Sequence, residues 1–278
     1  MIKHALFVLA LGPCQRPSDT PLPPKSRAET TSDSTTPPEP SPTTKKWTLA
    51  LPPTVATDWC VDSTRALDED TCYVLPGEPT STLLIYLHGI VPPAKDSYQK
   101  THFETVVANA ARRARAAALI PRGKQGLAPK GFAGWWGWPT SEVTYRANAS
   151  ELVPLIERKR RRLEQALGVE FSRVYLAGSS AGAYFAAALA LHGAFHADGF
   201  GAMSGGAGWQ TPELQRLEPK PFYIGYGASD SVRSAALALA ALLRRSGWPV
   251  RVAEHAVPHG AQEIYLDEAF AFWREHAP

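Results

Sequence analysis

The sequence predicts an α/β fold in which a mostly parallel β-sheet is flanked by helices on both faces. From Trp47 onward, short apolar runs with β-forming residues alternate with longer alanine- and leucine-rich segments of helical period. The 278 residues, of which 44% are hydrophobic and 20% charged, supply enough apolar surface for one sizeable core. Finally, Ser180 lies in a glycine-flanked turn directly between an apolar run and a helix-prone segment.

We expect three parts along the chain: a signal segment at 1–14, a tether at 15–46 and one folded domain at 47–278. The apolar runs predict strands at 72–75, 83–87, 117–121, 173–177, 199–203, 222–226 and 250–256. The segments of helical period predict helices at 98–114, 150–167, 181–192, 232–246 and 261–276.

The first residues have the pattern of an export signal, with Lys3 before an apolar stretch at 5–11 and Cys14 shortly after it. This arrangement resembles a bacterial lipoprotein signal, which implies that Cys14 becomes lipidated and forms the only link to a membrane. Pro13 departs from that pattern, so plain secretion and a cytosolic protein remain alternatives. The segment 15–46 consists mainly of Pro, Ser and Thr and cannot bury a core, which predicts an extended tether.

Cys60 and Cys72 are the other cysteines, and the stretch between them is polar. In an oxidising compartment a bridge between them is expected, since closing a loop of this size stabilises a fold by roughly 3 kcal/mol. Two separate buried thiols are the alternative.

Composition and spacing argue against several classes of ligand. A net charge of +3 is too small to indicate a nucleic-acid partner. The glycines near 199–208 do not have the spacing of a dinucleotide-binding turn, so no cofactor is expected. Pro258 separates His255 from His259 and removes the helical spacing of a metal pair, and no metal-type cysteine spacing occurs. We therefore expect no metal.

The sequence around Ser180 has the pattern of a nucleophile elbow, Gly-Ser-Ser-Ala-Gly between a strand and a helix. On such a sharp turn the residues two before and two after the serine press against backbone, so only very small residues fit. Gly178 and Gly182 meet that requirement, and the following helix directs its N-terminal N–H groups at the same place. The pattern predicts a serine hydrolase.

Asp230 and His259 are the expected partners of this serine. Asp230 follows the predicted strand at 222–226, and His259 follows the predicted strand at 250–256. The carboxyl ends of neighbouring parallel strands open onto one crevice, so the three side chains can meet there. Asp198 precedes a strand and lies at the wrong edge, while Glu254 and His255 fall within a strand; we expect structural roles for these.

From Trp47 to the C-terminus the succession of elements, with its elbow and the order Ser, Asp, His, resembles the α/β-hydrolase fold. Only 204–221 is available where members of this fold often insert a cap, which implies no separate cap domain. Within that fold, the elbow and the His88-Gly89 turn resemble those of feruloyl esterases, polyhydroxybutyrate depolymerases and dienelactone hydrolases. The resemblance implies an oxyanion hole formed by the backbone N–H groups of Ala181 and Ile90, with Val91 as an alternative to Ile90.

The segment at 132–139 places Trp135, Trp136 and Trp138 among glycines and a proline, which predicts a loop. We expect these tryptophans, with Tyr184, to bind substrate; the alternative is that the tryptophans form a small core of the loop itself.

We therefore expect an exported serine esterase, in the cell envelope or secreted, that cleaves a small-molecule or polymeric ester through an acyl-enzyme on Ser180. A peptidase or acyltransferase with the same three residues is one alternative. A non-catalytic glycan-binding module that uses the tryptophan loop is the other.

Overall fold

The computed structural model describes residues 55–94, 96–207, 209 and 214–277. The predicted signal segment 1–14, the tether 15–46 and the lipidation site Cys14 lie outside these residues. Within the described part, a mixed eight-stranded sheet has the order β1-β2-β4-β3-β7-β8-β9-β10. Its strands are β1 (Arg65–Asp68), β2 (Thr71–Val74), β3 (Thr82–Leu87), β4 (Ala117–Pro121), β7 (Arg173–Ser179), β8 (Gly199–Met203), β9 (Phe222–Gly227) and β10 (Val250–His255).

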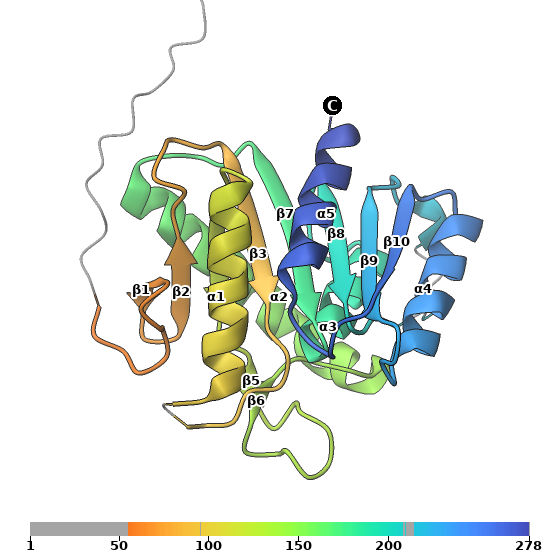
Figure 1. Ribbon diagram of the computed structural model, residues 1–278, viewed down its shortest axis with the longest axis horizontal. Helices are drawn as coiled ribbons and strands as arrows, with labels where there is room; N and C mark the ends of the chain where they lie inside the picture. Colours follow the sequence, from red (N-terminus) through yellow and green to blue (C-terminus); the bar gives the residue numbers. More distant parts are fainter. Residues whose placement is uncertain (1–54, 95, 208, 210–213, 278) are drawn as a thin grey trace, which may run out of the picture. The chain divides into compact units, whose positions relative to one another are not determined.

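The strands from β4 to β10 run parallel, and β1 and β2 add an antiparallel edge. Of the parallel strands, β4, β3, β7, β8 and β9 are almost wholly buried, whereas the edge strand β10 is partly exposed. The carboxyl ends of the parallel strands lie at the lower edge in Figure 1. All predicted strands are present and differ from the prediction by at most two residues at an end. The prediction missed β1 and a separate two-stranded sheet of β5 (Lys124–Gln125) and β6 (Trp136–Gly137).

Helices cover both faces of the sheet (Figure 1). One face carries α1 (Tyr98–Arg113) and α5 (Glu263–Glu275). The other carries α2 (Glu142–Leu167), α3 (Ala181–Leu191) and α4 (Arg233–Arg245). Each face has its own apolar cluster, and none of the helices in the described part is both long and apolar enough to span a membrane.

The start of α2 corrects the prediction, which began this helix at residue 150. The helix begins eight residues earlier, after Ser141, whose side chain accepts a hydrogen bond from the Thr144 N–H. The Thr144 hydroxyl in turn accepts from the Ser141 N–H, so that the two residues form a capping box. Pro154 lies inside α2 and does not interrupt the helix.

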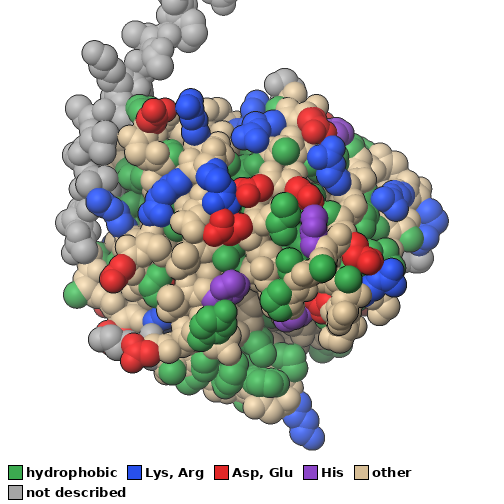
Figure 2. Space-filling view, viewed as in Figure 1, with side chains coloured by type: hydrophobic (Ala, Val, Ile, Leu, Met, Phe, Trp, Pro, Cys, Tyr) green, Lys and Arg blue, Asp and Glu red, His purple; other side chains and the backbone are tan. Residues whose placement is uncertain are grey.

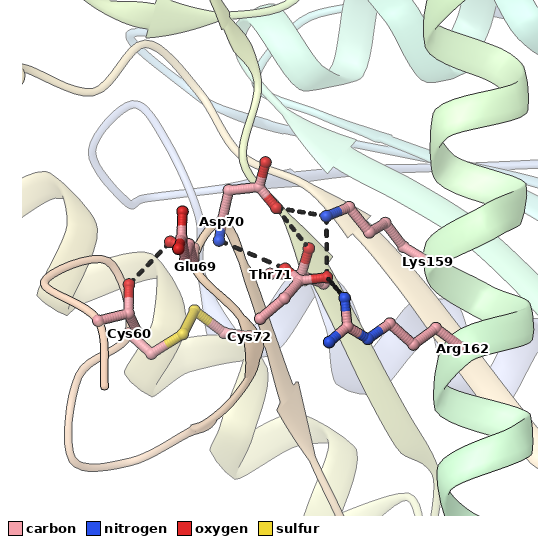
Figure 3. Close-up of polar contacts among 9 residues, drawn as sticks. Cys60, Glu69, Asp70, Thr71, Cys72, Lys159 and Arg162 are labelled. Carbon is pink, nitrogen blue, oxygen red and sulfur yellow. Dashed lines mark hydrogen bonds and ion pairs between the residues drawn. A yellow bond between two sulfur atoms is a disulfide. The ribbon is translucent and has the colours of Figure 1, made fainter. Parts of the chain in front are cut away.

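The edge at β1 and β2 is fixed by covalent and ionic contacts (Figure 3). A disulfide joins Cys60 to Cys72, as the sequence predicted. On the other side of the hairpin, Lys159 of α2 contacts Asp68 at 2.9 Å and also pairs with Asp70. Arg162, one turn further along α2, lies 3.2 Å from Asp68. The hairpin is therefore tied both to the segment before it and to a helix behind the sheet.

Candidate active site

Ser180 stands at the junction of β7 and α3 with φ 51° and ψ −119°, a conformation that non-glycine residues rarely adopt. Its N–H donates to the Met203 carbonyl at 2.9 Å, which links the turn to β8. A Cβ on Gly178 would lie 2.5 Å from the carbonyl carbon of Gly182, and a Cβ on Gly182 would lie 1.9 Å from the Leu87 oxygen. The turn thus has the crowding that the sequence predicted on both sides of Ser180.

The structure brings Ser180, Asp230 and His259 together. Asp230 follows β9 and His259 follows β10, the next parallel strand. His259 Nδ1 lies 3.0 and 2.9 Å from the two carboxylate oxygens of Asp230, and Nε2 lies 3.0 Å from Ser180 Oγ. A carboxylate only accepts hydrogen bonds, so Nδ1 carries the proton and Nε2 is left to accept from the Ser180 hydroxyl.

The Asp230 side chain is 1% exposed, whereas that of His259 is 45% exposed. Burial acts to raise the pKa of Asp230, but hydrogen bonds from the Val232 N–H and from His259 outweigh it and lower the pKa below its ordinary value. The carboxylate therefore stays charged while it orients the imidazole, whose other nitrogen reaches an open cavity.

The backbone N–H groups of Ala181 and Ile90 are the oxyanion donors that the sequence predicted. Ala181 is the first residue of α3, so its N–H has no intrahelical acceptor. In the loop after β3, the Val91 N–H donates to the Trp136 carbonyl at 2.9 Å and is not available to a ligand. The Ile90 N–H donates to no backbone carbonyl in the described part of the chain. Of the two residues considered from the sequence, Ile90 is therefore the one with a free donor.

His88 holds this loop in place. Its ring is fully buried, and burial lowers its pKa to about 4, so the imidazole is neutral. Nε2 accepts from the Gly123 N–H at 2.8 Å, and Nδ1 contacts the Gly89 carbonyl. A Cβ on Gly89 would lie 3.2 Å from the Ser180 Cβ, which shows how closely the loop approaches the serine.

A cavity of about 390 Å³ opens in front of Ser180. Its lining residues are Gly89, Ile90, Val91, Tyr98, Gln99, His102, Phe103, Phe132, Trp135, Ser179, Ser180, His259, Gly260 and Ala261. Figure 2 shows hydrophobic side chains gathered along the same lower edge of the molecule. The Tyr98 side chain is 75% exposed and stacks on His102 at a ring distance of 5.5 Å.

Of the aromatic residues expected at the substrate, only Trp135 lines this cavity. Trp138 is fully buried and stacks on Phe185, so it belongs to the core instead. Trp136 lines a different hollow, and Tyr184 is absent from the cavity wall. The three tryptophans therefore lie in three different surroundings: the catalytic cavity, a second hollow and the core.

Sequence reasoning missed Tyr98 and Phe132 as wall residues. Tyr98 begins a predicted helix, and nothing in its local sequence distinguishes a wall residue from an ordinary surface tyrosine. Phe132 stands in the same glycine-rich segment as Trp135 and forms an edge-to-face pair with it, with ring centroids 4.9 Å apart. The aromatic character of that segment could have been used to predict Phe132 as a wall residue.

The other acidic and histidine residues near the strands have structural partners. Glu254 pairs with Arg233 at 3.0 Å on the surface, and His255 lies 3.2 Å from Glu268. Asp198 accepts a hydrogen bond from the Val174 N–H at the opposite edge of the sheet. Within the described residues, no group of three His, Cys, Asp or Glu side chains is placed to hold a metal ion.

No protein-family model and no curated protein sequence matches this chain. Solved structures do match. Esterase PE8 is 18% identical, with 72% of this chain and 95% of that chain covered and a TM-score of 0.53. SOBER1 of Arabidopsis thaliana is 16% identical, with 70% and 98% covered and a TM-score of 0.53. The carboxylesterase of Bacillus cereus is 16% identical, with 74% and 93% covered and a TM-score of 0.51. Two of these three structures are named as an esterase and a carboxylesterase, and the likeness shows that the domain has the α/β-hydrolase fold.

Proposed function

We propose that this chain is a serine hydrolase that cleaves carboxylic esters. The observation that carries the proposal is the hydrogen-bonded series from Asp230 through His259 to Ser180, which ends on a serine in a strained turn at the floor of a cavity. The fold shared with solved esterases supports the same reaction class, although a fold alone does not select a substrate.

In the proposed reaction, Ser180 Oγ attacks the ester carbonyl carbon while its proton passes to His259 Nε2. The developing oxyanion accepts hydrogen bonds from the N–H groups of Ala181 and Ile90. His259 then gives the proton to the departing alcohol, which leaves an acyl group on Ser180. Water, deprotonated by His259, attacks the acyl carbon. The bond to Ser180 Oγ then breaks, His259 returns the proton to Oγ, and the carboxylic acid is released. Asp230 keeps the imidazole in the required tautomer and stabilises its charged form.

The cavity wall favours esters with an apolar or aromatic portion. Tyr98, Phe103, Phe132 and Trp135 present ring surfaces within reach of Ser180, and ring surfaces bind apolar groups best. We also propose that the protein is exported, which the Cys60–Cys72 disulfide and the signal-like pattern ending at Cys14 support. Fractionation of the producing cell tests that location.

The test of catalysis is labelling with a fluorophosphonate, which reacts with activated serines. We expect one adduct, on the peptide that contains Ser180, and loss of p-nitrophenyl ester hydrolysis by about 10⁴-fold or more in Ser180→Ala. Ser179→Ala is the matched control, because it removes the neighbouring hydroxyl and keeps Ser180; it should still be labelled. Turnover of esters without cleavage of matched amides would favour an esterase over a peptidase. Folded protein that is neither labelled nor active would contradict the proposal.

A further inference from the structure

A second hollow, of about 290 Å³, lies next to the catalytic cavity and is separated from it by one β-bridge. In that bridge, the N–H groups of Val91 and Trp136 donate to each other's carbonyl groups. Val91 lines the catalytic cavity, and Trp136 lines the second hollow. The residues that line the second hollow are Thr57, Asp58, Trp59, Pro92, Pro93, Ala94, Lys100, Arg122 and Trp136.

Arg122 is the residue that gives this hollow its chemistry. Its guanidinium lies 4.2 Å from the centre of the Trp136 ring and 5.5 Å from that of Trp59. Among the described residues, no carboxylate or carbonyl oxygen accepts a hydrogen bond from this half-buried guanidinium. The two rings hold the guanidinium in place and leave its N–H donors to other partners. A guanidinium held in this way is prepared to bind an oxyanion through two parallel hydrogen bonds.

The charge balance of the hollow also favours an anion. Lys100 is 3% exposed, lies 5.8 Å above the Trp59 ring and donates to the Asp58 carbonyl at 2.6 Å. Among the lining residues, Lys100 and Arg122 are basic and Asp58 is acidic. Burial lowers the pKa of His88, and the positive charge of Arg122 adds to that lowering.

We propose that this hollow is a binding site for an oxyanion, a carboxylate or sulfate, carried on a small apolar or ring-shaped body. Arg122 binds the oxyanion, and the walls formed by Trp59, Pro92 and Pro93 contact the apolar body. The oxyanion has two conceivable sources: a free small anion, or an acidic group of an ester that spans both hollows across the Val91–Trp136 bridge. The site itself does not depend on the proposed ester hydrolysis, because it is defined by binding.

Calorimetric titration of the whole chain with benzoate, with inorganic sulfate and with neutral benzyl alcohol tests the site. We expect saturable binding of benzoate, weaker binding of sulfate and the weakest binding of benzyl alcohol. Arg122→Met keeps an unbranched side chain against Trp136 and removes the charge, and should weaken benzoate binding at least about tenfold. Arg158→Met is the matched control: it removes an exposed arginine on α2 and should leave benzoate binding unchanged within about twofold.

Arg122→Lys retains the charge without the planar fork and should bind benzoate with intermediate affinity. If Arg122→Met does not fold, Arg122→Lys serves as the test variant in its place. Lack of saturable binding of both anions to the wild-type chain would overturn the proposal, and so would equal benzoate binding by wild type and Arg122→Met. Neither outcome bears on Ser180.

The source of the oxyanion is tested with two esters, one with a free carboxylate and its neutral homologue. If the group belongs to the substrate, Arg122→Met lowers kcat/KM at least about tenfold for the acidic ester only. If it belongs to a free anion, the ratio of the two kcat/KM values is unchanged while benzoate binding is still lost. Both results support the site and assign its ligand to one source.

Discussion

The turn at Ser180 and the connection between β4 and α2, residues 122–141, meet at the same cavity but are held in different ways. At Ser180 the contacts are between backbone atoms, where the flanking glycines leave no room for a side chain. In the connection the contacts are between rings: Trp138 stacks on Phe185, and Trp136 packs edge-on against Trp59.

This difference separates two kinds of structural information. Backbone crowding restricts which residues a position accepts, so it leaves a pattern in the local sequence. Ring packing depends on which partner the rest of the fold brings close, so identical tryptophans in one short segment reach different surroundings. We therefore expect substitutions in the turn to affect folding outright, and substitutions in the connection to have effects that depend on each residue's partner.

The largest effect is expected for Gly182→Ala compared with Gly134→Ala. The added methyl group at Gly182 would lie 1.9 Å from the Leu87 oxygen, whereas at Gly134 nothing lies within 4 Å. We expect Gly182→Ala to yield no folded protein or to lose more than about 4 kcal/mol of unfolding free energy. Gly134→Ala should change it by less than about 0.5 kcal/mol. Urea unfolding measures both, and similar losses for the two would remove the distinction between the regions.

A smaller effect is expected within the connection, for Trp138→Ala compared with Trp135→Ala. Trp138 is fully buried, so its removal should cost about 3–5 kcal/mol of unfolding free energy. Trp135 is half-buried at the cavity wall, and its removal should cost less than about 1 kcal/mol. If the cavity binds aromatic groups, Trp135→Ala lowers kcat/KM for an aromatic ester several-fold relative to an acetyl ester. Equal stability losses for the two variants would contradict the assignment of Trp138 to the core and of Trp135 to the cavity wall.

The sequence was sufficient to predict the parallel strands, the turn and the residues that meet there. Each of these has a local cause: apolar runs for the strands, glycine crowding for the turn, and position at a strand end for Asp230 and His259. The late start predicted for α2 overlooked a local cue, the capping box formed by Ser141 and Thr144.

Features that depend on contacts distant in sequence could not be predicted. The Val91 N–H cannot serve as an oxyanion donor because it donates to the Trp136 carbonyl, and no local sequence pattern predicts that hydrogen bond. Tyr98 becomes a cavity wall because α1 begins at the same edge of the sheet as the turn. The stacking of Arg122 on Trp136 likewise depends on the path of the whole connection.

The smallest effect concerns the support of the connection by the segment before β1. Trp59, which packs on Trp136, precedes a turn whose Val61 N–H and Thr64 hydroxyl donate to the buried carboxylate of Glu104 at 2.9 and 2.6 Å. Burial outweighs these hydrogen bonds and raises the pKa of Glu104 from 4.5 to about 7. A carboxyl whose pKa is higher in the folded state stabilises the fold below the unfolded pKa, and this contribution is lost as the pH rises through the folded value.

We therefore expect Glu104 to remove on the order of 2–3 kcal/mol of unfolding free energy between pH 5 and pH 8. Glu104→Gln keeps an acceptor for the turn and does not ionise, so its stability should fall less over that range. Urea unfolding of wild type and variant at both pH values measures the difference. Glu78→Gln is the control, because the Glu78 side chain is exposed. If the stability of wild type and of Glu104→Gln changes equally with pH, the prediction is wrong. The support of the connection would then be independent of pH, as is the crowding at Ser180, where the atoms around Gly178 and Gly182 belong to no ionisable group.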